Sequence, residues 1–315
     1  MISKMTRFSL LTVSIIVLAV SLQAKDINSN AGTSAFSFLK INVSARAVGM
    51  GGAFTGLAND ESALYYNPAG ITSIEDPKYI FGYHNYFFDM QSGFLGYVKP
   101  LSEKRSIGFY LSYLNYGSFT ATDDLGNADG EFGGGDLLFA VSLAQKKNHL
   151  VSFGATAKFI YETIDSYSAT GVAMDLAVKY TSDRGKFGAG FMLQNLGTQL
   201  SALGETKDKL PTTIRSGVSI IPKGLPMTLT SDLILPFDND LIFAIGVDYF
   251  NFEPFYIRMG WNSFGSNYKA TNSDASLTGM SFGCGFDVKK MQVSYAFTPS
   301  ADLGDSHRIT ITGQL

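Results

Sequence analysis

The sequence has little charge. Asp, Glu, Lys and Arg make up 16% of its 315 residues, well below the share of about a quarter that is usual in soluble proteins. A soluble protein of this size needs a charged surface, so the shortage counts against one. The formal net charge of −3 is close to neutral, and nothing in it indicates nucleic acid as a partner.

Cysteine and long apolar runs are also scarce. Cys284 is the one cysteine, so an internal disulfide framework is excluded. Beyond the N-terminus, no run in the sequence is long and apolar enough for a transmembrane helix, which needs roughly 20 residues. An integral membrane protein of this kind must form a closed β-barrel, because only helices and barrels satisfy every backbone polar group in lipid. A soluble exported protein is the alternative at this point.

Residues 1–24 are predicted to be a cleavable signal peptide. Lys4 and Arg7 give a positive start, residues 8–20 are apolar, and small residues follow up to a cleavage point after Ala24. The apolar stretch is too short to cross a hydrocarbon core as a helix. A retained N-terminal anchor helix is the alternative. Together with a barrel, the signal predicts a bacterial outer-membrane protein, with outer-membrane lipid around it.

Aromatic residues and glycine, by contrast, are abundant: 25 Phe, 16 Tyr and 33 Gly. From about Lys78 to the C-terminus, apolar and polar residues alternate with period two, which indicates strands with one apolar face. About fourteen such segments can be counted, with lengths near the roughly 9–11 residues that a tilted strand needs to cross a bilayer. They cover residues 79–87, 91–99, 106–116, 136–146, 150–162, 168–181, 186–195, 212–221, 226–235, 240–250, 254–263, 276–288, 290–298 and 306–315.

The two faces of these segments differ in charge. In the clearest segments the apolar face carries none, as a lipid-facing surface requires, since a Lys or Arg at the bilayer midplane would cost about 2–4 kcal/mol. A soluble β-sandwich would need more Lys and Glu on its wet face. We therefore predict an all-β fold: a transmembrane antiparallel β-barrel of about fourteen strands over residues 78–315. The predicted lumen charges are Lys158, Asp175, Lys179, Arg215, Asp232, Asp248, Arg258, Asp287 and Arg308.

Loop lengths agree with a barrel. Long connections at 117–135, 196–211 and 264–275 follow odd-numbered segments, whereas tight turns such as Lys223-Gly224 follow even-numbered ones. Short turns on one side and long loops on the other are typical of outer-membrane barrels. The long loops are polar and glycine-rich.

Residues 25–77 break the alternation and form an N-terminal segment. Gly49, Gly51 and Gly52 lie in a stretch of small residues suited to close packing. Asp60 is predicted to cap a short helix from Ser62 to Tyr66, and that helix should end at Asn67 because Pro68 follows. Pro68 and Ala69 then indicate a turn.

This segment has two interpretations, a periplasmic lead-in or a short helical plug inside the lumen. Arg46, Asp60 and Glu61 could pair with the lumen charges and hold a plug in place. The mixed signs of those charges fit a plugged barrel better than an open pore, which would favour one sign.

Three stretches of the segment resemble a known family. Phe38-Leu39-Lys40-Ile41 and residues 45–54, followed by Ala63-Leu64-Tyr65-Tyr66-Asn67-Pro68-Ala69-Gly70, closely resemble the PorV/PorQ family of outer-membrane proteins. The Asn-Pro-Ala-Gly part also resembles the FadL long-chain fatty-acid transporters. The match covers roughly residues 36–72. It implies a fourteen-stranded barrel with this segment at or inside its periplasmic end.

The resemblance implies two functions. A PorV-like chain would be a type IX secretion or surface-assembly component, with secretion-system proteins and exported clients as partners. A FadL-like chain would be a passive transporter of hydrophobic small molecules. The predicted inner faces offer few large apolar groups, Met192 and Ile234 being isolated examples, and this favours the secretion role.

Enzyme chemistry is not predicted, and neither is a cofactor or a metal. Gly279-Met280-Ser281-Phe282-Gly283 matches a serine-hydrolase pattern, but Ser281 lies mid-strand without the strand–turn–helix context that this chemistry needs. The three histidines have no metal-site spacing. The acidic loop 123–131 lacks a ligand at the first position of a calcium loop.

Overall fold

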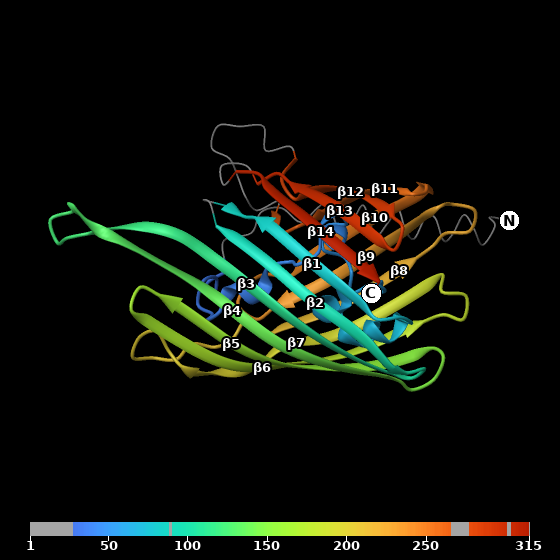
Figure 1. Cartoon of the computed structure of the whole chain (residues 1–315), viewed down its shortest axis with the longest axis horizontal. Helices are drawn as coiled ribbons and strands as arrows, with labels where there is room; N and C mark the ends of the chain where they lie inside the picture. The colour runs from blue at the N-terminus through green and yellow to red at the C-terminus, as the bar shows by residue number, and fades with distance from the viewer. Residues whose placement is uncertain (1–27, 88–89, 266–276, 301–303, 315) are drawn as a thin grey trace.

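The chain forms a closed antiparallel β-barrel of fourteen strands (Figure 1). This computed structural model describes residues 28–87, 90–265, 277–300 and 304–314; the predicted signal peptide lies outside them. Each strand pairs with its neighbours in the sequence, and β1 closes the barrel on β14. None of the described helices is long and apolar enough to cross a membrane. The predicted all-β barrel is confirmed.

The fourteen strands follow the predicted segments in order. Their bounds are β1 Lys78–Asn85, β2 Gln91–Ser102, β3 Arg105–Thr122, β4 Ala128–Lys146, β5 Val151–Ile164, β6 Tyr167–Thr181, β7 Phe187–Ser201, β8 Thr213–Ile220, β9 Met227–Pro236, β10 Ile242–Phe252, β11 Phe255–Asn262, β12 Met280–Val288, β13 Met291–Thr298 and β14 Ser306–Gln314.

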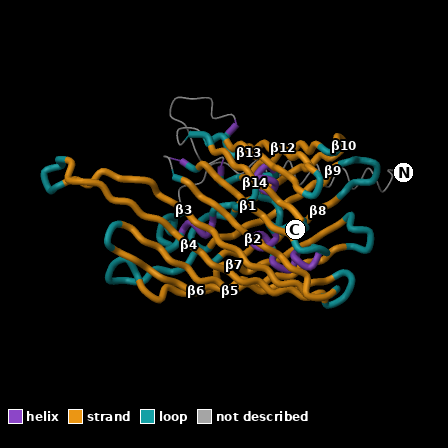
Figure 2. Tube along the Cα trace, in the orientation of Figure 1, coloured by secondary structure: helices purple, strands orange, loops and turns teal. Residues whose placement is uncertain are grey.

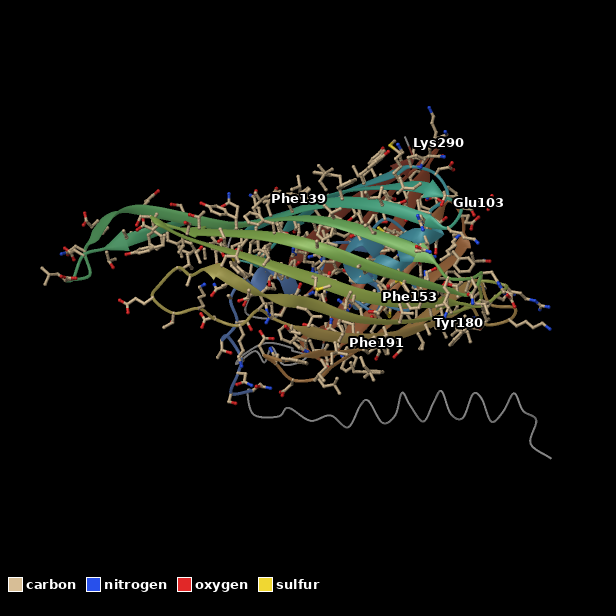
Figure 3. The ribbon with its side chains drawn as sticks, turned by 90° about the horizontal axis from the view of Figure 1, so that it is seen from below. Glu103, Phe139, Phe153, Tyr180, Phe191 and Lys290 are labelled. Atoms are coloured by element: carbon tan, nitrogen blue, oxygen red, sulfur yellow. The ribbon has the colours of Figure 1, made fainter. Side chains whose placement is uncertain are left out.

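The alternation of the sequence becomes two different faces of the wall. Outward positions carry exposed apolar side chains such as Phe139, Phe153 and Phe191, which project from the strands in Figure 3. Inward positions alternate with them and are buried, for example Thr156 and Lys158 of β5. An apolar, uncharged outer face is what a barrel in lipid requires.

The connections between consecutive strands alternate between the two ends of the barrel. Glu103 in the β2–β3 turn and Lys290 in the β12–β13 turn both lie at one end (Figure 3), which we call the turn end. The β3–β4, β7–β8 and β9–β10 connections lie at the other, the loop end. β1 begins at the turn end and β14 finishes there, because Lys78 pairs with Gln314.

The predicted long loop 117–135 is wrong. β3 and β4 continue through it as a hairpin that projects beyond the rest of the loop end (Figure 1). Ser118 pairs with Gly133, and the stacked rings of Phe119 and Phe132 lie 5.4 Å apart. The two strands continue to pair with each other past a bulge at Gly117, whose φ is +79°.

The predicted loop 196–211 is also too long. β7 continues to Ser201 because its outer half keeps pairing with β6, past a bulge at Asn195, while β8 begins only at Thr213. The predicted loop 264–275 lies mostly outside the described residues.

The N-terminal segment lies inside the barrel and carries all of the named helices. It contains η1 Ser37–Lys40, α2 Ala45–Gly49, α3 Ala63–Tyr66 and η2 Pro68–Ser73, and Figure 2 shows them among the strands. α2 packs against β11–β14, and η2 packs against β3–β6. The segment starts near the loop end, where Asn28 Nδ2 donates to Asp240 3.0 Å away, and reaches the turn end at β1.

The short helix before Asn67 is confirmed. α3 ends at Tyr66, and Asn67 is extended, with φ of −172°, as the following proline requires. Asp60 accepts the backbone N–H of Ser62 at 2.9 Å. The turn predicted at Pro68 and Ala69 is instead the start of η2, because Pro68 suits the first position of a helical turn.

Candidate functional site

Arg46 joins the N-terminal segment to the barrel wall. Its Nε lies 3.1 Å from Asp248 Oδ2 on β10, and its Nη1 lies 2.8 Å from Asp60 Oδ2 in the same segment. Arg258 on β11 extends this series of ion pairs, because its Nε lies 3.0 Å from Asp248 Oδ1. The alternating signs let each buried charge face an opposite one, which burial requires.

These neighbours shift the pKa values of the segment's own groups. Burial would lower the pKa of Arg46, but the carboxylates of Asp248 and Asp60 outweigh it and raise that pKa. Burial would likewise raise the pKa of Asp60, and Arg46 outweighs it and lowers that pKa. Burial and the adjacent Asp60 raise the pKa of Glu61, whose partner across 3.4 Å is Lys78 rather than a predicted lumen charge.

Three further predicted lumen charges bind the segment's backbone. Asp232 on β9 accepts the N–H groups of Phe54 and Thr55 at 3.1 and 2.9 Å. Arg215 on β8 donates to the carbonyl of Gly52 at 3.0 Å, and Lys179 on β6 donates to that of Ala58 at 2.6 Å. These bonds satisfy backbone groups in a stretch with few helical bonds of its own.

The remaining predicted lumen charges bind within the wall. Lys158 and Asp175 form a buried ion pair at 2.7 Å, beside the bulge at Asn195. Arg308 donates to His84 at 2.7 Å, and Asp287 accepts from Tyr256 at 2.6 Å near the turn end. The charges predicted to face the lumen therefore form two groups. One group contacts the N-terminal segment, and the other binds partners within the barrel wall.

The Asn67-Pro68-Ala69 motif fixes the segment's path. Asn67 Nδ2 donates to the carbonyl of Thr55 at 3.0 Å and to that of Val178 on β6 at 3.2 Å, while its Oδ1 accepts the N–H of Ala69. One side chain thus ties two parts of the segment to the wall. Asn67 is completely buried.

Inward glycines of the wall let the segment approach closely, a role the sequence reasoning missed. A Cβ on Gly154 would lie 2.3 Å from Ala69 N, and one on Gly190 would lie 2.2 Å from the carbonyl oxygen of Thr55. The segment contributes Gly51, whose φ is +68° and whose Cβ would lie 2.7 Å from the carbonyl oxygen of Trp261. Ser281 accepts the N–H of the same Gly51 at 3.0 Å. The glycines at inward-facing positions of several predicted strands could have indicated this close packing.

The two other glycines predicted to pack closely also lie at contacts. A Cβ on Gly49 would lie 3.1 Å from Gly283 Cα of β12, and one on Gly52 would lie 3.3 Å from Asn42 Nδ2. Gly49 therefore packs against the barrel wall, whereas Gly52 packs against another residue of the segment.

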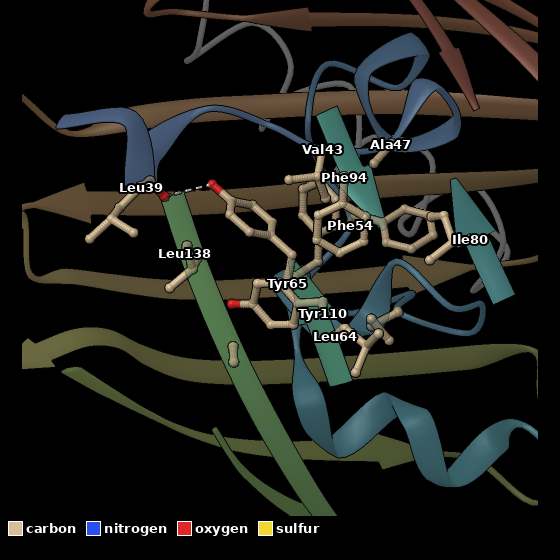
Figure 4. Packing of buried hydrophobic residues seen from close by; sticks show 14 of the residues in the cluster. Leu39, Val43, Ala47, Phe54, Leu64, Tyr65, Ile80, Phe94, Tyr110 and Leu138 are labelled. Atoms are coloured by element: carbon tan, nitrogen blue, oxygen red, sulfur yellow. Dashed lines mark hydrogen bonds between the residues drawn. The ribbon is translucent and has the colours of Figure 1, made fainter. Parts of the chain in front are cut away.

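The inner face of the first strands is apolar, which corrects the prediction of few large apolar groups there. Ile80, Phe94, Tyr110 and Leu138 are at most 3% exposed and pack against Leu64 and Tyr65 of the segment (Figure 4). Tyr65 donates to the carbonyl of Leu39 at 3.1 Å. In the first two segments, which contain Ile80 and Phe94, the alternation of the sequence leaves the register ambiguous.

A cavity of about 440 Å³ lies at the loop end beside this apolar face. The segment contributes Phe36 and Phe38 to its walls, β3 contributes Leu114, and the β7–β8 connection contributes Leu203. Thr206 and Asp208 of that connection also line it and are exposed, so the cavity opens to the loop end. The arrangement can hold a small apolar molecule between the segment and the wall.

No family model and no curated protein matches this sequence. Solved structures do. The toluene transporter TodX of Pseudomonas putida superposes with a TM-score of 0.61 at 12% identity, over 87% of this chain and 99% of its own. The chain has the fold of these channels.

Two further solved structures are similar. The monoaromatic hydrocarbon channel CymD gives a TM-score of 0.60 at 13% identity, over 89% of this chain and 99% of its own. A FadL homologue of Pseudomonas aeruginosa gives 0.56 at 12% identity, over 86% and 98%. The FadL-like part of the resemblance agrees with these likenesses. PorV/PorQ membership stays a prediction.

Proposed function

We propose that this chain is an outer-membrane channel that lets hydrophobic small molecules enter the cell passively. The observation that carries the proposal is the cavity at the loop end between the barrel wall and the N-terminal segment, whose apolar walls include Phe36, Leu114 and Leu203. The fold, shared over almost the whole length with hydrocarbon channels, supports it. The favoured secretion role rested on an absence of apolar lining, and the buried inner faces of β1–β5 remove that argument.

The proposed mechanism follows from the properties of the cavity and from the contacts of the N-terminal segment. An apolar molecule leaves water at the loop end because burial of its surface in the cavity is favourable by about 25 cal/mol per Å². Further passage requires the N-terminal segment to shift, since it fills the lumen beyond the cavity. The hydrogen bonds of Asp232, Arg215 and Lys179 hold the segment against β9, β8 and β6.

The test is uptake of radiolabelled toluene by bacterial cells that lack their own hydrophobic channels. Cells with the wild-type chain should take up toluene faster than cells with an empty vector. Ala202→Trp places a large ring in the cavity wall and should lower the rate several-fold. Ala157→Trp is the matched control, since Ala157 faces outward on β5. Equal uptake with and without the chain would overturn the proposal.

The secretion role predicted from the PorV/PorQ resemblance is a separate hypothesis. It expects exported proteins to co-purify with the barrel and secretion genes to lie beside its own. Toluene uptake by the wild-type chain without any co-purifying exported protein would argue against it.

A further inference from the structure

The cavity at the loop end has acidic groups among its apolar walls. Asp136 of β4 and Glu162 of β5 line it, together with Asp208 of the β7–β8 connection. The described residues that line this cavity include no Lys, Arg or His. A purely apolar cargo makes no use of such groups, and burying a carboxylate without a partner is costly.

Asp136 and Glu162 are directly opposite each other across the β4–β5 pair. Like charges in this position destabilise a sheet. Both side chains point inward, and Asp136 is only 5% exposed. When both are charged, the two carboxylates repel each other, and a cation between them would relieve the repulsion.

The protein satisfies this pair only in part. Tyr116 of β3 lies 2.7 Å from Asp136 Oδ2 and 3.3 Å from Glu162 Oε1, but its hydroxyl has one proton and can donate to one carboxylate at a time. Asp136 Oδ1 is buried and has no hydrogen-bond donor in the described part of the chain. An ammonium group brings three donors.

The apolar walls suit the rest of such a ligand. Phe36 and Phe38 of the segment and Tyr86 after β1 line the same cavity as the acidic pair. Aromatic faces attract cations as well as apolar groups. The space of about 440 Å³ is enough for a small aromatic or alkyl body.

A neighbouring cavity has the opposite charge. It measures about 350 Å³, shares Ile41 and Tyr86 with the first, and is lined by Lys40, His84 and Arg308. Its cations already have partners, since Lys40 pairs with Asp238 and Arg308 donates to His84. An apolar carboxylate would still meet positive charge there rather than the carboxylate of Asp136.

Resting on the proposed uptake of hydrophobic molecules, we propose that the loop-end cavity selects small apolar amines in their ammonium form. Asp136 and Glu162 bind the ammonium group, and the aromatic walls hold the apolar body. The preference comes from charge-assisted hydrogen bonds, which are about twice as strong as neutral ones.

The experiment compares three probes on the purified full-length barrel in a zwitterionic detergent. 2-Phenylethylamine, 2-phenylethanol and 3-phenylpropionate share one apolar body and differ in their polar group. Titration calorimetry, with empty micelles as the blank, should show the amine binding roughly tenfold more tightly than the alcohol at pH 7.

The double variant D136N/E162Q removes the charges and keeps the side-chain shapes. It should weaken the amine roughly tenfold and change the alcohol by less than about twofold, since only the ammonium uses the charge. The matched control D124N/E131Q removes two exposed charges from the β3–β4 hairpin, outside the cavity, and should leave all three probes unchanged.

The outcomes separate the inference from the proposed function. Equal affinity of wild-type protein for amine and alcohol would mean that protons already neutralise the pair, and this overturns the inference while uptake of apolar molecules stands. A preference that survives in D136N/E162Q would also overturn it. Failure of all three probes to bind, together with failed toluene uptake, would overturn the proposed function itself. If the double variant does not fold, the wild-type comparison still decides.

Discussion

At the residue scale, single atoms decide how the N-terminal segment fits into the barrel. Gly51 has a φ of +68°, and a Cβ there would lie within 2.8 Å of backbone atoms of Trp261 and Ile245. No side chain can be accommodated without moving two strands. The backbone of the segment therefore packs directly against the backbone of the wall at this point.

Gly51→Ala is expected to lower the free energy of unfolding by about 3 kcal/mol, from backbone strain plus overpacking. Thermal melting of the purified barrel in detergent, followed by circular dichroism, measures it. Gly204→Ala is the control, since a Cβ there meets nothing within 4 Å. Equal melting temperatures for the two variants would contradict the close approach.

Arg46→Ala should loosen the segment, because it leaves Asp60 without its cation and leaves Asp248 paired only with Arg258 of the wall. Breaking one partner of such a pair costs about 3 kcal/mol. We expect a lower unfolding temperature and a higher single-channel conductance in planar bilayers. Arg184→Ala removes an exposed arginine in the β6–β7 turn and should change neither. If both quantities stay at wild-type values in Arg46→Ala, the segment is held by other contacts.

Glu61 should make stability depend on pH. Its pKa in the folded barrel is raised above the ordinary value of 4.5 by burial and by the neighbouring Asp60, so the folded state binds a proton more tightly than the unfolded chain. The stabilisation is therefore complete below pH 4.5 and is lost as pH rises through the folded pKa. Melting curves of wild type and Glu61→Gln at several pH values test this. The variant should lack that part of the pH dependence, and parallel curves would contradict it.

At the scale of elements, the β3–β4 hairpin is independent of the barrel beyond its rim. β2 stops pairing with β3 at Asn115, and β5 stops pairing with β4 at Gly134. From Ser118 to Phe132 the strand pairs that the described residues form lie within the hairpin. The hairpin therefore adds surface at the loop end but is not part of the closed barrel.

Replacing residues 118–132 with a two-residue turn should change the free energy of unfolding by less than about 0.5 kcal/mol, as substitutions away from the core do. The same melting experiment measures it. A large loss of stability would show that the projecting hairpin supports the barrel below it.

The N-terminal segment was predictable as an element but not in its contacts. The end of α3 at Tyr66 followed from Pro68 two residues later. The bond from Lys179 to the carbonyl of Ala58 joins positions 121 residues apart, and no local pattern encodes it. The cavity escaped prediction for the same reason, since Phe36, Leu114 and Leu203 meet only in the closed barrel.

At the scale of the whole molecule, the barrel has two unlike ends, and the proposed uptake requires the loop end to face outward. An epitope inserted after Gly126 in the β3–β4 hairpin should be labelled by antibody on intact cells. The same epitope after Lys147 in the β4–β5 turn should be labelled only after the outer membrane is permeabilised. Labelling of the turn end alone would reverse the proposed direction of entry.

The sequence by itself determined the number and order of the strands and the outer face, because period-two alternation is a local property that lipid enforces along each strand. The tertiary structure decided the rest. Register placed Asp136 opposite Glu162, and closure brought Phe36 beside Leu114. Register and closure also divided the predicted lumen charges between the segment and the wall. Such contacts depend on strand pairing and on how the segment lies inside the barrel, and residues far apart in the sequence meet only when both are complete.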